Sequence, residues 1–404
     1  MSVPFFRPEI GDEEIAEVAA CLRSGWLTSG PRTKQFEEDF AKVVGAQHVL
    51  AVNSCTAGLH LAVEALGLRE RQAVLVPTWT FAATAEVVRY QGAIPVLVDC
   101  DPETFQICWE DAAHKLRLLR DGKLPGIAAD TPVVGVIVVH MAGVMNDPEV
   151  SNAFAREHKL WLVEDAAHAL PAAWRKDAES PWVRCGENTA AATCFSFYAN
   201  KTITTGEGGM VATSDPELAD RMKLMCLHGL SRDAWSRFSG GKSWDYRIVA
   251  PGFKYNLTDI QSAVGIHQLA KAESMRKARE RIAHKYIDAF GDLEAFEIPK
   301  ICSNRVDSWH LFPIRLNLDQ LTLNRNDFID TIRERGIGCS VHYRPLHLHP
   351  YYSEDAFAWS PELLPKASAL WPRVLSLPLF SSQTDTEAET VIQVIQEVVR
   401  EHQR

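Results

Sequence analysis

Short apolar segments that alternate with helical segments constrain the fold of this chain more than any other feature. The pattern runs from about residue 36 to residue 265, and the apolar segments have the length of strands. Continuous apolar strands separated by helices are typical of a parallel sheet that is covered on both faces. Ligands in such sheets bind at the carboxyl ends of the strands. We therefore expect an α/β fold with strands at residues 48–52, 73–77, 94–98, 133–140 and 160–164 and helices around residues 57–66 and 82–90.

The chain is long enough for two domains. We expect residues 1–264 to form a large α/β domain with an N-terminal arm, and residues 265–404 to form a connecting helix and a smaller α+β domain. A long charged stretch at residues 265–290 predicts the connecting helix. The smaller domain is predicted to hold strands at residues 309–315 and 337–343 and a closing helix at residues 387–399.

Charge and composition argue against several classes of partner. A net charge of -10 would repel a nucleic acid duplex, so we expect no nucleic acid partner. The longest apolar run, residues 133–145, is far shorter than the roughly 20 residues of a membrane span. The first residues lack the pattern of a signal peptide, and the nine cysteines form no CxxC pair. These features predict a cytoplasmic protein without a disulfide framework or a zinc site.

Three strand ends carry residues that are suited to chemistry. After the strand at residues 48–52, small hydroxyl residues stand at the start of a helix, where they could cap the helix or help to bind an anion. Asp165 follows the strand at residues 160–164 and could cap a helix. It could also keep a cofactor's pyridine nitrogen protonated, as pyridoxal phosphate chemistry requires. In that case His168 would lie near the oxygen of the cofactor ring.

The third strand end carries Lys201, which lies between a strand-like segment at residues 193–197 and a glycine-rich turn that leads into another apolar strand. A lysine on a loop is usually solvated. Between two core strands it could be desolvated, which would lower the pKa of its amine and make the amine nucleophilic. Ser196 and the glycine-rich turn could contribute to binding a phosphate. We expect Lys201 to hold pyridoxal phosphate as a Schiff base.

The ordered set of motifs resembles the DegT/DnrJ/EryC1/StrS family of sugar aminotransferases over nearly the whole chain. The matching motifs are residues 53–57, 77–84, 164–169, 195–201, 252–261, 309–312 and 341–347. The resemblance implies an aspartate-aminotransferase-like fold of type I, with a mostly parallel seven-stranded sheet and a smaller C-terminal α+β domain. It also implies a homodimer whose active sites are shared between the subunits.

The resemblance implies a role for each matching residue around the cofactor. Lys201 would form the internal aldimine and move the proton, Asp165 would pair with the pyridine nitrogen, and His168 would lie near the ring oxygen. Phe81, rather than Trp79, would stack on the cofactor ring. The remaining cofactor-binding positions, of which the last three match phosphate-binding positions of the family, are Ser54, Cys55, Thr56, Ala57 and Ser196.

Other positions are implied in binding the partner's cofactor or the substrate. The segment 252–259 would reach the partner's cofactor phosphate through Lys254 or Asn256, because many relatives read Asn-Tyr-Arg where this chain reads Lys-Tyr-Asn. Lys242, which follows a glycine pair, His310 and His342 are candidate substrate-binding residues. Three histidines crowd residues 342–349, but no cysteine lies close to them in sequence. A zinc site would need four ligands, so we expect no metal.

The resemblance also implies the reaction. L-glutamate would donate the amine and a nucleotide-diphosphate-linked keto sugar would accept it, in amino-sugar biosynthesis for a surface polysaccharide such as lipopolysaccharide O-antigen. Amination of a 4-keto-6-deoxy sugar at C4 is favoured. Amination of a 3-keto sugar in an antibiotic or glycan pathway is the alternative, and a non-catalytic cofactor-binding regulator is a second one.

Overall fold

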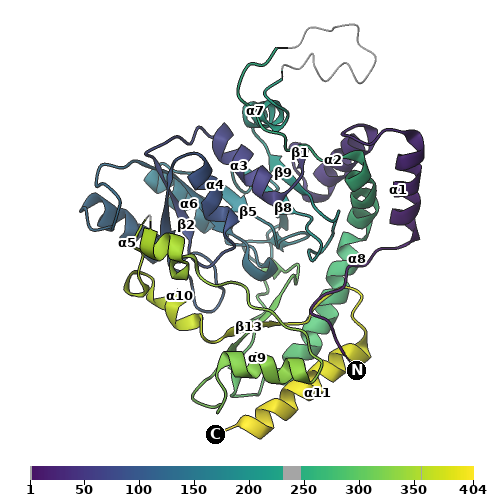
Figure 1. Cartoon of the computed structure of the whole chain (residues 1–404), viewed down its shortest axis with the longest axis vertical. Helices are drawn as coiled ribbons and strands as arrows, with labels where there is room; N and C mark the ends of the chain where they lie inside the picture. Colours follow the sequence, from purple (N-terminus) through teal and green to yellow (C-terminus); the bar gives the residue numbers. More distant parts are fainter. Residues whose placement is uncertain (1, 231–246, 356) are drawn as a thin grey trace.

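A seven-stranded sheet forms the centre of the computed structural model, which describes residues 2–230, 247–355 and 357–404 (Figure 1). Strand β9 runs antiparallel to both of its neighbours, β1 and β8, and all other pairs of neighbouring strands are parallel. The expected mostly parallel, seven-stranded sheet is therefore confirmed. Across the sheet, the strands are β1 (His48–Val52), β9 (Gly209–Thr213), β8 (Ala192–Ser196), β5 (Trp161–Asp165), β4 (Val133–Val139), β2 (Ala73–Pro77) and β3 (Ile94–Val98).

Both faces of this sheet are buried. Successive side chains of a strand point to opposite faces, and each face packs in an apolar cluster. In β8, Cys194 packs in one apolar cluster and Phe195 packs in another. Helix α3 (Cys55–Ala65) covers the first face, where it contacts β5, β8 and β9. Residues of α2 (Pro31–Val44) and α8 (Asp259–Phe290) cover the second face. The other helices of this region are α1 (Asp12–Ser24), α4 (Ala83–Tyr90), α5 (Trp109–Arg120), α6 (Pro148–His158) and α7 (Pro216–Cys226).

Helix α8 runs from the large sheet to a third apolar cluster, which surrounds a small antiparallel sheet (Figure 1). The helix begins earlier than predicted, because Thr258 and Gln261 form a capping box at its first turn. Around this third cluster lie β10 (Phe296–Glu297), β12 (Phe312–Leu316), β13 (Val374–Leu377), α9 (Arg325–Glu334) and α11 (Asp385–His402). The remaining elements are β11 (Arg305–Val306), β6 (Ala173–Trp174) and β7 (Val183–Arg184), which form a third sheet, α10 (Pro365–Leu370), and the short helices η1 (Met141–Gly143), η3 (Leu346–Leu348), η4 (Tyr351–Asp355) and η5 (Pro361–Leu363).

The prediction of a strand at residues 337–343 is wrong. This segment forms only isolated bridges, one from Ile337 to Val3 and one between two serines. The N–H of Gly338 donates to the carbonyl of Val3 at 2.8 Å, so the N-terminal arm pairs with this segment at a single residue. The strand expected at residues 309–315 begins only at Phe312, because Trp309 has a φ of 54°, outside the extended region. Among the described residues, no helix has both the length and the apolar character needed to cross a lipid bilayer.

Candidate active site

A cavity of about 460 Å³ lies at the carboxyl ends of β1, β5 and β8. Its lining residues range from Ser54 to Tyr343, so the fold brings together segments that are far apart in the sequence. The lining includes nine residues that the sequence singled out, which are Ser54, Cys55, Thr56, Phe81, Asp165, His168, Ser196, Lys201 and His342. Ala57 is buried beside this group, and Lys242 lies outside the described residues.

Lys201 lies in the turn between β8 and β9, where its backbone N–H donates to the carbonyl of Tyr198 at 3.0 Å. Burial lowers the pKa of its amine to about 8, although Cys55 and Asp165 act in the opposite direction. A lysine with a pKa near 8 has a substantial neutral fraction at physiological pH, and the neutral amine is the nucleophile. The environment of Lys201 therefore suits covalent capture of a carbonyl compound.

Asp165 ends β5 and is almost fully buried. Burial raises the pKa of its carboxyl, whereas the hydroxyl of Thr84, the N–H of Ala167 and the charge of Lys201 lower it. Thr84 Oγ1 donates to Asp165 Oδ2 at 2.7 Å, and the N–H of Ala167 donates to Oδ1 at 3.2 Å. These donors favour the charged carboxylate inside a buried site, as a partner for a protonated ring nitrogen requires.

The first turn of α3 adjoins the cavity through Ser54, Cys55 and Thr56. The N-cap residue of this helix is Ser54, whose Oγ accepts the N–H of Ala57 at 3.0 Å. Gly209, the first residue of β9, lies so close that an added Cβ would stand 2.7 Å from the N–H nitrogen of Cys55. The glycine therefore lets β9 approach the helix end. A helix N-terminus of this kind favours anions.

Three histidines lie in or beside the cavity. The rings of His168 and His310 pack at a tilt of 43° with their centroids 4.3 Å apart, and burial lowers the pKa of both rings well below the ordinary value. His310 lies behind His168 and does not line the cavity. Nδ1 of His342 lies 3.1 Å from the hydroxyl of Ser376, and burial lowers the pKa of this ring to about 4. All three rings are therefore neutral near pH 7.

Phe81 and Trp79 occupy different environments. The ring of Phe81 is 59% exposed and faces the cavity, with its centroid 5.6 Å from that of Tyr343. Trp79 is fully buried, packs against Phe105, and donates its ring N–H to the carbonyl of His342 at 3.1 Å. Of these two rings, only Phe81 is placed to meet a molecule in the cavity.

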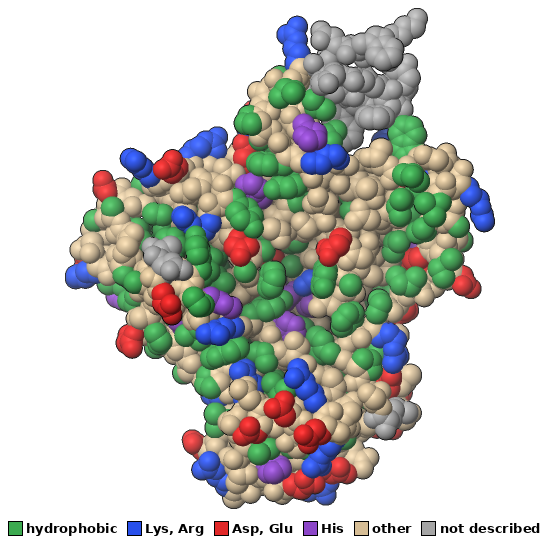
Figure 2. Space-filling view, viewed as in Figure 1, with side chains coloured by type: hydrophobic (Ala, Val, Ile, Leu, Met, Phe, Trp, Pro, Cys, Tyr) green, Lys and Arg blue, Asp and Glu red, His purple; other side chains and the backbone are tan. Residues whose placement is uncertain are grey.

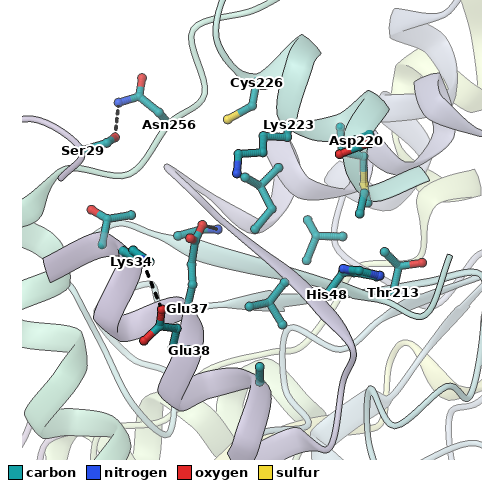
Figure 3. Close-up of a pocket in the computed structure, with 18 of the residues that line it drawn as sticks. Ser29, Lys34, Glu37, Glu38, His48, Thr213, Asp220, Lys223, Cys226 and Asn256 are labelled. Carbon is teal, nitrogen blue, oxygen red and sulfur yellow. Dashed lines mark hydrogen bonds and ion pairs between the residues drawn. The ribbon is translucent and has the colours of Figure 1, made fainter. Parts of the chain in front are cut away.

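Lys254 and Asn256 lie away from the cavity. Lys254 is exposed and its amine donates to the side-chain oxygen of Asn256. Asn256 lies at the edge of a second cleft of about 800 Å³, between α2, α7 and β1, where its amide donates to Ser29 Oγ at 2.7 Å (Figure 3). Neither residue therefore contacts a cofactor bound in its own chain's cavity.

A buried cluster of His140, Glu164 and Cys185 lies outside the cavity, with its ligand atoms within 4.8 Å of one another. The N–H of Asn146 donates to His140 Nδ1 at 3.1 Å, so the ring hydrogen is on Nε2, 3.6 Å from Glu164 Oε1. Two threonine hydroxyls donate to the other carboxylate oxygen at 2.6 and 2.7 Å. Burial alone would raise the pKa of Glu164, but these neighbours lower it.

The residues of the cavity fit pyridoxal phosphate. They provide an amine of lowered pKa, a buried carboxylate, the N-terminus of a helix and an exposed aromatic face, as that cofactor's aldehyde, ring nitrogen, phosphate and ring require. With the parallel sheet, this donor set defines an aminotransferase of fold type I that depends on pyridoxal phosphate.

The chain belongs to the DegT/DnrJ/EryC1/StrS aminotransferase family, whose model matches residues 8–396. It is 42% identical to the uncharacterized protein MJ1066 of Methanocaldococcus jannaschii over 99% of this chain and 98% of that protein. It is 39% identical to the spore coat polysaccharide biosynthesis protein SpsC of Bacillus subtilis, over 98% and 97%. A solved structure of Spr1654 from Streptococcus pneumoniae, provisionally named a sugar aminotransferase and determined in its PMP form, matches with a TM-score of 0.87 at 28% identity, over 99% of this chain and 98% of that one. Sugar transamination is thus the activity of this family.

Two polar residues of the site escaped the sequence analysis. Thr84 and Tyr343 both lie within matching motifs, but neither received a role. In the structure Thr84 is fully buried against Asp165, and Tyr343 lines the cavity and contacts His168. The only sequence signal for Thr84 is a hydroxyl residue in an otherwise small and apolar helix start.

Proposed function

We propose that this enzyme transfers the amino group of L-glutamate to a nucleotide-diphosphate-linked keto sugar, at C4 of a 4-keto-6-deoxy sugar, for the synthesis of a surface polysaccharide. When bound, pyridoxal phosphate supplies the electron sink for moving the amino group. Lys201 would hold the cofactor and move the proton, and Asp165 would keep its ring nitrogen protonated. The observation that carries the proposal is the enclosure of both residues in one cavity whose mouth is aromatic.

The mouth of the cavity suits a sugar ring. Phe81 and Tyr198 line it with rings that are 59% and 48% exposed. Aromatic faces of this kind offer apolar surface to the C–H groups of a sugar, and few charged groups compete with them. The similarity to the spore coat polysaccharide biosynthesis protein SpsC supports a product that enters a surface polysaccharide.

The diphosphate of such a substrate needs cations that the cavity of one chain lacks. Among the described residues, Lys201 is the one lysine or arginine that lines it. We propose that a second copy of the chain completes the site in a homodimer and contributes Lys254, Asn256 and Lys242. Exposed apolar side chains support a subunit interface. Figure 2 shows hydrophobic side chains gathered over the region of α1, and Ile15 and Leu22 of that helix are exposed.

The proposal is tested by the absorbance of the purified enzyme loaded with pyridoxal phosphate. Adding L-glutamate should convert the band of the cofactor attached to lysine into that of the amine form, and adding the correct keto sugar should restore it. A panel of UDP-, GDP- and dTDP-linked 4-keto and 3-keto sugars, with ¹⁵N-glutamate as donor, should identify the acceptor. The position of the product carbon that is bonded to ¹⁵N then distinguishes amination at C4 from amination at C3. An unchanged spectrum with every amino donor would refute the proposal.

A further inference from the structure

A chain of hydrogen bonds connects the backbone of Ala142, the ring of His168 and the hydroxyl of Tyr343. The N–H of Ala142 donates to His168 Nδ1 at 3.3 Å, and His168 Nε2 lies 3.1 Å from the oxygen of Tyr343. His168 is only 5% exposed. The three groups come from η1, from the loop after β5 and from the segment before η3. The contact therefore exists only in the folded chain.

The backbone N–H of Ala142 fixes the tautomer of His168. Because an N–H group can only donate, Nδ1 must present its lone pair and carry no hydrogen. Burial lowers the pKa of the ring well below its ordinary value, and the charge of Lys201 lowers it further. His168 is therefore neutral, with its one ring hydrogen on Nε2. That hydrogen points to the oxygen of Tyr343, so His168 donates and Tyr343 accepts.

Tyr343 keeps its own hydroxyl hydrogen for another acceptor. Burial and the charge of Asp165 raise the pKa of the hydroxyl above its ordinary value, so it stays protonated. The bond to His168 uses a lone pair of the oxygen and leaves the O–H free. Within the described part of the chain the hydroxyl has no second hydrogen-bond partner, and Tyr343 lines the cavity that holds Lys201.

Neighbouring rings hold Tyr343 in place. Its ring centroid lies 5.6 Å from that of Phe81 and 6.0 Å from that of His168, with the latter pair nearly parallel at 29°. A hydroxyl on a ring that is packed against other rings loses little freedom when it donates to a bound molecule. Tyr343 is thus a preorganised donor.

We propose that Tyr343 donates a hydrogen bond to an oxygen atom of the molecule bound in the cavity, and that His168 sets its direction. This inference rests on the proposed function, because two oxygens of that reaction qualify. One is the negatively charged ring oxygen of the cofactor, and the other is the keto oxygen of the sugar. Both are acceptors, and both gain most from a donor when they carry negative charge.

The first experiment measures the pH midpoint at which the absorbance of lysine-bound cofactor changes, without any substrate. Tyr343→Phe should raise this midpoint by about one pH unit, because a lost donor leaves the ring oxygen more negative and the adjacent nitrogen holds its proton more tightly. The matched control is Tyr351→Phe, which removes a surface hydroxyl bonded to Arg89 at 3.0 Å and should leave the midpoint unchanged.

A pair of His168 variants tests the direction of the donor separately. His168→Leu removes the donor to Tyr343 and should shift the midpoint as Tyr343→Phe does. His168→Gln can accept the N–H of Ala142 through its oxygen and donate to Tyr343 through its nitrogen, so it should restore the wild-type midpoint. This pair keeps the test informative even if one variant folds poorly, which circular dichroism would show.

If the acceptor is the keto oxygen of the sugar, a different result is expected. The midpoint would stay in place, and the rate of amine transfer to the sugar would fall about tenfold in Tyr343→Phe while the half-reaction with glutamate stayed constant. The inference is overturned if Tyr343→Phe matches Tyr351→Phe in both the midpoint and the sugar half-reaction. Failure of the proposed function is distinguishable, because the wild-type protein would then show no glutamate-dependent change before any substitution.

Discussion

Replacing Thr84 by valine should weaken the enzyme most strongly at acidic pH. Thr84 is fully buried, and its Oγ1 donates to Asp165 Oδ2 at 2.7 Å. Because this hydroxyl donates to the carboxylate, it must accept from Thr80, whose Oγ1 lies 2.7 Å away. Valine has nearly the same shape as threonine, so the substitution removes the hydroxyl and leaves the packing of α4 largely intact.

The size of the effect follows from the hydrogen bond that is lost. A hydrogen bond to a charged group contributes about 1.5–3 kcal/mol, which corresponds to roughly one to two pKa units. Burial already raises the pKa of Asp165, and among the neighbours that lower this pKa the Thr84 hydroxyl has the largest effect. Thr84→Val should therefore raise the pKa of Asp165 by about that amount. A neutral acid cannot hold the cofactor's ring nitrogen protonated, so activity would be lost as the pH falls.

The pH dependence of kcat/KM and the dissociation of the cofactor, followed by absorbance, are the measurements. We expect the acidic limb of the profile to move upward by roughly one to two pH units in Thr84→Val, with near-normal activity at alkaline pH. Thr84→Ser keeps the hydroxyl and is the matched control. If the profiles of the valine and serine variants coincide, then Thr84 does not set the charge state of Asp165 and the reasoning fails.

Three further predictions concern single residues. Lys201→Ala should bind pyridoxal phosphate without forming a borohydride-stable adduct, and a stable adduct mapped to another lysine by mass spectrometry would contradict the role of Lys201. Because burial lowers the pKa of Lys201 to about 8, covalent capture of the cofactor by the apoprotein should accelerate as the pH rises through about 8; a stopped-flow rate that stayed flat from pH 6.5 to 9 would argue against this. Glu37, in the cleft of Figure 3, has its pKa raised by burial from 4.5 to about 7, so its contribution to stability is full below pH 4.5 and is lost as the pH rises through 7. Glu37→Gln keeps an acceptor for the N–H of Ala51, which Glu37 binds at 2.8 Å; it should melt like the wild type near pH 5 and at a higher temperature near pH 8, and a gap that did not widen with pH would disprove the assignment.

The strands of the large sheet could be predicted because their signal is local. The five expected strands all exist, with ends within a residue or two of the prediction. Continuous burial on both faces makes each strand apolar by itself, whichever strands lie beside it. Asp165 was found for the same reason, since an acid at the end of such a strand is visible in the sequence.

The smaller sheet was harder to predict because its pairing is decided elsewhere. Residues 337–343 have a strand-like composition, but Ile337 bridges to Val3 and not to a long neighbouring strand. A strand needs a partner along its length, and the sequence does not show which edge is available. Trp309 shows a similar limit, because a positive φ is unusual for a bulky side chain and its residue type does not predict one.

The sequence by itself determined which functional groups follow the strands along the chain, namely a helix cap at Ser54, a carboxylate at Asp165 and a lysine at Lys201. Only the tertiary structure decided how these groups are tuned. Thr84 and Asp165 are 81 residues apart in sequence, and His168 and Tyr343 are 175 apart. A pKa and a tautomer depend on burial and on donors within about 3 Å of an atom, and such distances exist only once the chain has folded.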